Sequence, residues 1–369
     1  MAVADPAAPD SERTERSRAL HRRWTSVGIG GALVALFLIG VLFGPVPIPP
    51  ATVFHILAYQ LTFGLLGGSP CGAEVSAARC GTLVLIVWGA LVPEIVLAFA
   101  AGALLGLSGG LLQGIFRNPL ADPYLLGIST GAAIGAALLF VFNVGLQVAN
   151  VALPLFAFVG AVLTGAVILI AARSSRSSTE TLLLTGVALN AFLSAVLVFT
   201  LIYNPVGNLQ LDYWLLGGVF GANWPNDGLI VGGLFVVGVV ISLEARGVNL
   251  LQLGGDVAQS LGVDARRLVS RSILFASMAT ALAVAFTGVI GFVGLIAPHL
   301  VRRLFGYDYR RVLPLSGVLG AILLGGAFDL SFNVVRATEL PIGVPMAFLG
   351  GPFFVYVLYR YRRDPRRGW

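Results

Sequence analysis

The stretch LQGIFRNPLADPYLLGISTG, residues 112–131, is the most informative part of this chain. A polar turn at 117–123, with a proline near each end, separates two apolar runs in which glycine recurs at every fourth position. The glycines are Gly102, Gly106, Gly110 and Gly114 before the turn and Gly127, Gly131 and Gly135 after it. This spacing strips one side of a helix of side chains, so that another helix can approach closely in lipid. The pattern predicts a membrane helix bundle, with either a functional loop or an ordinary connection at 117–123.

The composition is that of a polytopic helical membrane protein. Of the 369 residues, 57% are hydrophobic and only 11% are charged, whereas soluble domains carry roughly 25% charged residues. Apolar runs of about 20 residues recur along the chain, as membrane-spanning helices require, without the strict alternation of a β-barrel. We predict an all-α fold with about ten transmembrane helices, at roughly 24–43, 83–111, 124–142, 151–172, 182–203, 228–243, 270–290, 291–305, 313–335 and 342–361.

The chain has polar ends. Residues 1–23 are polar and basic, and we expect a disordered cytoplasmic tail there. The apolar run that follows lacks a small-residue cleavage site, so it is interpreted as a first span and not as a signal peptide. The membrane domain is expected to cover 24–361, followed by a cytoplasmic tail at 362–369.

All 23 basic residues are arginine, and their positions indicate the topology. Alternating the predicted helices from a cytoplasmic N-terminus leaves only Arg79 and Arg336 outside, as the positive-inside rule requires. The net charge of +6 is therefore a topology signature and not a nucleic-acid-binding surface. Without lysine the chain cannot supply the lysine of a P-loop. If ATP drives this protein, the ATPase is a different chain.

The two cysteines, Cys71 and Cys80, both fall in the first predicted outer loop, 44–82. That compartment is oxidising, so a disulfide is expected, with two free thiols as the alternative. Zinc binding is not expected because His55 is the only nearby histidine, and we expect no metal site or cofactor. The stretch 51–66 predicts an amphipathic helix on the outer membrane surface.

The longest predicted inner loop is 244–270. Its central segment, 254–262, predicts a short helix ended by Gly262 that could dock in a groove on a cytoplasmic partner. A solvated linker helix is the alternative. Docking is favoured because the loop is too apolar for a free linker, with apolar side chains at Leu250, Leu251, Leu253, Val257 and Leu261.

Five stretches together resemble the FecCD family of ABC-importer permeases, the class that moves iron–siderophores, haem and cobalamin. They are SGGLLQGIFRNPLADPYLLGISTGAAIGA, TLLLTGVALNAF, WLLGGVFGANW, GGDVAQSLGVDARRL with GVIGFVGLIAPHLVRRL, and ELPIGVPMAFLGGPFFVYVLYR. The resemblance covers about residues 83–361. It implies ten helices per subunit, a second copy forming a homodimer around a central path, two separate ATPase subunits and an external substrate-binding protein.

The resemblance also implies roles for particular residues. The segment matching the family's coupling helix, which sits on the ATPase, contains Gly254, Gly255, Asp256, Ala258, Leu261 and Gly262. The helices matching 182–203 and 342–361 line the path. The candidates for the path and its inner gate are Ser178, Thr179 and Asn190.

The outer face departs from the family pattern. Leu91-Val92-Pro93-Glu94 stands where the family commonly has R-[LI]-P-R, and Asn333 occupies the arginine position of D-x-x-x-R after Asp329. In family members these arginines meet acids on the binding protein, so that contact cannot be carried over. We expect an acidic docking surface that includes Glu94 and Asn333, with Arg336 as the candidate replacement. The other acids predicted on this face are Glu74, Asp212, Asp227 and Glu339.

Two classes of function remain. The first is a non-catalytic ABC-importer permease in the cytoplasmic membrane, with both termini in the cytoplasm. The second is an ion-coupled secondary transporter, for which Asp329 and Glu94 are the only candidate intramembrane carboxylates. We favour a structural contact for Asp329, because the family carries an acid there too. No Ser-His-Asp or two-histidine spacing suggests catalysis, and the sequence does not discriminate among the cargoes.

Overall fold

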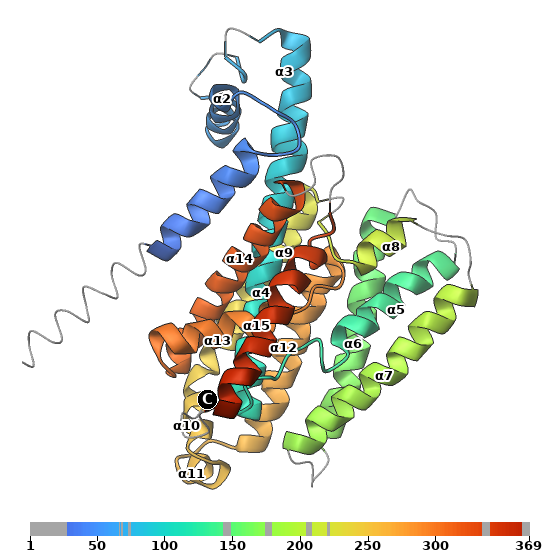
Figure 1. Ribbon diagram of the computed structural model, residues 1–369, viewed down its shortest axis with the longest axis vertical. Coiled ribbons are helices and arrows are strands. Elements are labelled where there is room, and N and C mark those ends of the chain that lie inside the picture. Colours follow the sequence, from blue (N-terminus) through green and yellow to red (C-terminus); the bar gives the residue numbers. More distant parts are fainter. Residues whose placement is uncertain are drawn as a thin grey trace, which may run out of the picture.

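The computed structural model of the protein describes residues 28–65, 67, 69–72, 75–142, 149–173, 179–203, 209–219, 222–333 and 340–363. Within these ranges every regular element is helical. After a first helix at Gly28–Leu42, the elements labelled in Figure 1 or lying between the labels are α2 (Pro50–Leu61), α3 (Ala77–Val84), the π-helix η1 (Leu85–Leu91), α4 (Val92–Phe116), α5 (Ile128–Val141), α6 (Ala149–Arg173), α7 (Thr179–Tyr203), α8 (Leu209–Leu215), α9 (Trp224–Leu243), α10 (Ala245–Gln252), α11 (Gly255–Ser260), α12 (Ala265–Thr287), α13 (Val293–Phe305), α14 (Tyr309–Asn333) and α15 (Gly343–Arg363).

Among the described residues, six helical stretches are long and apolar enough to cross a membrane. They are Ala77–Phe116, Val151–Ala172, Thr181–Ile202, Trp224–Gln252, Ala265–Thr287 and Tyr309–Asn333. Shorter apolar helices cover Gly28–Leu42, Ile128–Leu139 and Gly343–Val357. The predicted class, an all-α multi-pass membrane protein, is confirmed, whereas the number of ten crossings stays a prediction.

The second predicted helix, 83–111, is too short at both ends. The structure joins α3, η1 and α4 into one helical stretch of 40 residues, Ala77–Phe116. At 1.5 Å per residue this stretch spans about 60 Å, twice the roughly 30 Å core of a bilayer. Part of it must therefore extend beyond the membrane, and Figure 1 shows α3 projecting past the other long helices beside α2. The helix expected at 51–66 is α2, which ends at Leu61.

The inner loop predicted at 244–270 is largely helical. It contains α10 and α11, and α12 begins within it, at Ala265. Asp264 fixes that early start, because its side chain accepts a hydrogen bond from the Arg267 backbone amide. The helix predicted at 124–142 begins later than expected, since the backbone between Asp122 and Gly127 is occupied by turns.

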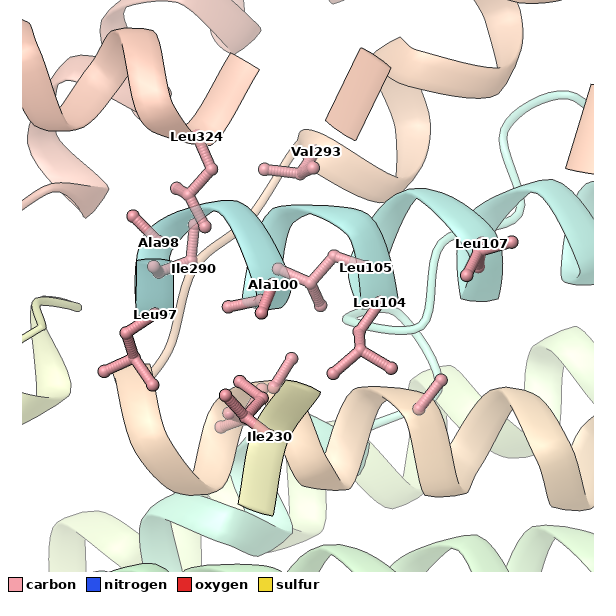
Figure 2. Close-up of a cluster of buried hydrophobic side chains, with 14 of the residues drawn as sticks. Leu97, Ala98, Ala100, Leu104, Leu105, Leu107, Ile230, Ile290, Val293 and Leu324 are labelled. Carbon is pink, nitrogen blue, oxygen red and sulfur yellow. The ribbon is translucent and has the colours of Figure 1, made fainter. Parts of the chain in front are cut away.

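Helix α4 forms the centre of the bundle. It contacts α14, α12, α13 and α9, and Figure 2 shows its side chains surrounded by those of the neighbouring helices. Leu97, Leu104 and Leu111 have at most 1% of their surface exposed. A helix that is apolar on every side, as α4 is, belongs in the interior of a bundle.

The glycine spacing around residues 112–131 does allow close helix contacts. A Cβ on Gly106 would collide with the Ser316 carbonyl of α14, and one on Gly135 would collide with the Phe156 carbonyl of α6. The two glycine-lined helices, α4 and α5, therefore serve different partners. Small residues at such crossings let backbones approach where lipid provides no hydrophobic driving force.

Candidate transport path and coupling surface

A cavity of about 770 Å³ lies between the connecting segments and α15. Its wall is formed by the loop after α4, the end of α8, the segment joining α12 to α13, and the first turns of α15. The lining is mostly apolar and includes Leu125, Leu216, Phe292, Leu295, Ala347 and Phe348, with Asp122 and Tyr124 contributing polar groups. The dimensions are those of a small-molecule site.

Asp122 brings a carboxyl group to this wall. It is 7% exposed, and its Oδ1 accepts a hydrogen bond from the Tyr124 backbone amide at 3.0 Å. Burial raises the pKa of Asp122 to about 6, against the smaller lowering by the Tyr124 amide. The carboxyl group is therefore poised between its charged and neutral forms just below neutral pH.

The segment with the predicted coupling role is α11, at one end of the molecule in Figure 1. Gly254 and Gly262 flank it with φ angles of 117° and 84°, which only glycine adopts readily. Leu253, Val257 and Leu261 are 63%, 43% and 56% exposed. An apolar surface on a short helix whose ends are fixed is suited to docking on a partner.

Not every predicted coupling residue faces outward. Asp256 is exposed, but Ala258 has no exposed surface, and its carbonyl accepts a hydrogen bond from the Val263 amide. Ala258 therefore seats α11 on the body of the protein and cannot touch a partner. The alternation of inward and outward residues on one helical turn explains the difference.

The described residues include only two of the three predicted gate and path residues, Thr179 and Asn190. Ser178 lies outside the described residues, and Thr179 is the first residue of α7. Asn190 joins α7 to α5, because its Oδ1 accepts a hydrogen bond from Thr130 Oγ1 at 2.5 Å. Asn190 does not line the 770 Å³ cavity.

Of the predicted outer docking residues, one lies inside the helical stretch Ala77–Phe116 and another at the end of α14. Glu94 is half-buried in the first turn of α4, and Asn333 ends α14, where its side chain donates to the Asp329 carbonyl at 2.8 Å. Arg336 lies outside the described residues. Asp227, one of the acids expected on this face, is only 2% exposed and cannot contribute to a surface.

Cys71 and Cys80 form a disulfide with their Cα atoms 5.7 Å apart. The bond ties the segment after α2 to α3, at the end of the molecule opposite α11 (Figure 1). Among the described residues there is no group of three or more His, Cys, Asp or Glu side chains placed to hold a metal ion.

Sequence reasoning missed a group of polar side chains where α4, α10, α13 and the start of α14 meet. Gln113, at the end of α4, is 2% exposed, donates to the Gly294 and Leu295 carbonyls, and accepts from Arg302. Gln252 of α10 donates to the Gly114 carbonyl, and Asn249 of α10 donates to Asp308. A glutamine inside an otherwise apolar glycine-rich helix was the available signal.

An all-helical, multi-pass membrane protein with a cavity between its helices has the architecture of a membrane transporter. The comparisons with known proteins define its family. The chain belongs to the FecCD transport family, which it matches over residues 32–360. That family consists of ABC transporter permeases, which are transport components and not catalytic subunits.

Two relatives and one solved structure illustrate the similarity. The cobalamin import system permease protein BtuC of Halobacterium salinarum is 37% identical over 362 residues, covering 90% of this chain and 95% of the relative. The hemin transport system permease protein HmuU of Yersinia pestis is 38% identical over 280 residues, covering 75% and 83%. A metal-chelate type ABC transporter in an inward-facing conformation superposes with a TM-score of 0.70 at 26% identity, covering 85% of this chain and all of that one.

Proposed function

We propose that the protein is the permease subunit of an ABC importer that moves a metal chelate into the cytoplasm, driven by ATP hydrolysis on separate subunits. The observation that carries the proposal is the family match over nearly the whole chain, residues 32–360. The lysine-free sequence agrees with it, because a P-loop must then come from another chain.

The architecture of the complex follows from the same family. The complex contains two copies of this chain around a shared path, two ATPase subunits at the inner face and a substrate-binding protein at the outer face. It resides in the cytoplasmic membrane with both termini of this chain inside, as the arginine distribution indicates. The exposed leucines around α11 supply the ATPase contact, and the α4 and α14 ends near Glu94 and Asn333 receive the binding protein.

The cargo class rests on the relatives, whose names include cobalamin and haemin import. The cavity accommodates part of such a molecule, and its apolar wall fits a large planar ring better than a hydrated ion. Competition between a corrinoid, a haem and a ferric siderophore for uptake would identify which of them is the cargo.

Reconstitution tests the proposal. The chain is placed in proteoliposomes with its cognate ATPase subunit and binding protein, and uptake of cyanocobalamin, haemin and ferric citrate is measured. We expect uptake of one of them to require ATP and to persist in the presence of a protonophore. Uptake that proceeds without the ATPase and collapses with the protonophore would instead establish the ion-coupled transporter, with Asp329 as the first residue to examine.

A further inference from the structure

Phe292 has a backbone conformation that a bulky residue rarely adopts. Its φ is 70° and its ψ −24°, at the residue that precedes the first turn of α13. Phenylalanine in this region is an outlier and is retained only where the surroundings enforce it. Phe292 also lines the cavity. A strained residue in the wall of a transport cavity is a candidate for a part that moves.

Two neighbours enforce the conformation. The Phe292 ring packs on Gly350 of α15 so closely that a Cβ at position 350 would collide with it. Its carbonyl accepts hydrogen bonds from the Leu295 and Ile296 amides at 3.1 and 2.8 Å, which begin α13. The position of Phe292 therefore depends on α15 on one side and on the first turn of α13 on the other.

Gln113 holds that first turn. Its Nε2 donates to the Gly294 carbonyl at 3.1 Å and to the Leu295 carbonyl at 3.3 Å, and its Oε1 accepts from Arg302 at 2.5 Å. Gly109, one turn earlier in α4, lies against Gly294 with no room for a side chain. The end of α4 and the start of α13 therefore move as one piece.

Gln252 connects this piece to the coupling surface. Its Nε2 donates at 2.8 Å to the carbonyl of Gly114, the residue next to Gln113. Gln252 is the last residue of α10, and α11 begins three residues later, at Gly255. A continuous series of contacts thus leads from the exposed helix α11, through Gln252 and Gln113, to Phe292 in the cavity wall.

We propose that Gln252 and Gln113 are positioning residues that transmit displacement of α11 to Phe292. The inference rests on the proposed function, because an ATPase must displace α11. When α10 and α11 shift, Gln252 moves the end of α4, and Gln113 moves the first turn of α13. Phe292 then leaves its left-handed conformation and its seat on Gly350, which changes the width of the cavity. The two conformations of Phe292 supply the two-state element that such coupling needs.

The test measures the accessibility of a cysteine placed in the cavity wall. Cys71 and Cys80 are bonded to each other and are the only cysteines in the chain, so Ala347→Cys places a single reactive thiol on α15 at the cavity. The full-length variant is assembled with its ATPase subunit in nanodiscs. Its maleimide labelling rate is measured without nucleotide and after trapping with ATP and vanadate. We expect the two rates to differ by about fivefold or more, as a shift between two populated states gives.

Three further substitutions are combined with this reporter. Gln113→Glu keeps an acceptor for Arg302 but removes the donor to the Gly294 and Leu295 carbonyls. Gln252→Leu removes the link to Gly114 from a surface position, where misfolding is not expected. Asn249→Ala is the matched control, because the hydrogen bonds of the Asn249 side chain connect α10 to Asp308 and Tyr309 and not to α4.

We expect vanadate trapping to persist in all three, with the labelling difference lost in the two glutamine variants and kept in Asn249→Ala. An undiminished difference in Gln252→Leu, or in a folded Gln113→Glu, overturns the inference while leaving the permease assignment intact. Loss of the difference in Asn249→Ala as well overturns it too, since coupling would then be spread over the whole inner end. If the reporter alone shows no dependence on ATP while uptake still requires ATP, this inference fails and the proposed function stands; uptake that needs no ATP overturns both.

Discussion

The two ends of the helix bundle are stabilised in different ways: the end that carries α11, which we propose faces the cytoplasm and call the inner end, and the end that carries α3, which we call the outer end (Figure 1). At the inner end, Gln113, Gln252 and Asn249 join four segments through hydrogen bonds between side chains and backbone. At the outer end, a disulfide joins Cys71 to Cys80, and the indole of Trp224 stacks on that of Trp88 and donates to its carbonyl at 3.0 Å.

The difference concerns how each end can respond to force. Directional hydrogen bonds between neighbouring helices pass a displacement from one helix to the next and re-form afterwards. The disulfide, by contrast, fixes the local conformation of the segment from α2 to α3, which projects from the bundle (Figure 1), without connecting that segment to the core. We therefore expect the inner end to transmit a movement and the outer end to keep a docking surface in place, and five predictions test that contrast.

The largest effect is expected at a close backbone contact of the inner half. Gly109→Val would drive a side chain into the Gly294 backbone, which cannot yield without separating α4 from α13. Overpacking of this kind costs about 3 kcal/mol or more, and we expect loss of folded protein in detergent by fluorescence-detected gel filtration. Gly81→Val in α3 is the matched control, because a Cβ there meets nothing within 4 Å. A folded, monodisperse Gly109→Val would show that the contact between α4 and α13 is not rigid.

The second prediction concerns the exposed apolar surface of α11. The double variant Val257→Glu and Leu261→Glu places two charges where an ATPase groove would need apolar contact. We expect at least a roughly tenfold weaker association with the ATPase subunit, about 1.4 kcal/mol, and loss of stimulated ATPase activity, measured in the reconstituted complex. Ala258 is left unchanged because its substitution would unseat the helix. Normal stimulation in the folded double variant contradicts the docking role.

The third prediction concerns the disulfide at the outer end. Under the loop-closure model, replacing Cys71 and Cys80 by serine costs about 2–3 kcal/mol, confined to the outer segment. Limited proteolysis should then cut between α2 and α3 faster, while ATP-driven uptake stays within about twofold of the wild type. Reduction of the wild-type protein should reproduce the effect. Recovery of both residues as free thiols in non-reduced peptides from the native host would refute the bond.

The sequence carried enough information for the class, the positions of most helices and the close contacts, because apolar run length and glycine spacing are local signals. It could not reveal that Gly106 packs against α14 and Gly135 against α6. The spacing of glycines along one helix carries no information about which distant helix packs against it. The burial of Ala258 and the left-handed backbone of Phe292 depend on tertiary packing, which for Phe292 involves Gly350 of α15. The glutamines were visible as polar residues near apolar segments. Their partners are mostly backbone carbonyls, which every residue carries, so the sequence could not indicate which carbonyl each glutamine contacts.

The fourth prediction concerns Asp122, in the wall of the 770 Å³ cavity. Burial raises its pKa to about 6 in the folded protein, so the carboxyl group favours folding below its unfolded pKa of about 3.9, and that contribution is lost as pH rises through 6. Above pH 6 the folded protein contains a buried charge. Asp122→Asn should therefore stabilise the protein at pH 7.5, by on the order of 1–3 kcal/mol, and by about half as much at pH 5. Melting temperatures of both proteins at the two pH values test this, and equal differences would show that the charge is not buried.

The smallest effect is expected for Glu94, at the outer start of α4. Glu94→Arg reverses a charge at a position where the resembled family has arginine, on a face that we expect to receive the binding protein. If that partner presents basic or apolar residues there, the substitution weakens docking by only about 0.2–1 kcal/mol, because ion pairs at a solvated rim contribute little, and mainly by slowing association at low salt. Dissociation constants and association rates are measured at low and moderate salt.

Asp212→Arg is the control for this last substitution, because it makes the same charge change at an exposed position of α8. Slower association in Glu94→Arg alone would place the docking contact near Glu94. Equal slowing in both variants would indicate long-range electrostatic attraction without a local contact. Tighter binding by Glu94→Arg would mean that the partner has acidic lobes of the ordinary family kind. The binding protein would then carry the acidic docking residues usual in this family, even though the permease lacks the arginines that usually meet them.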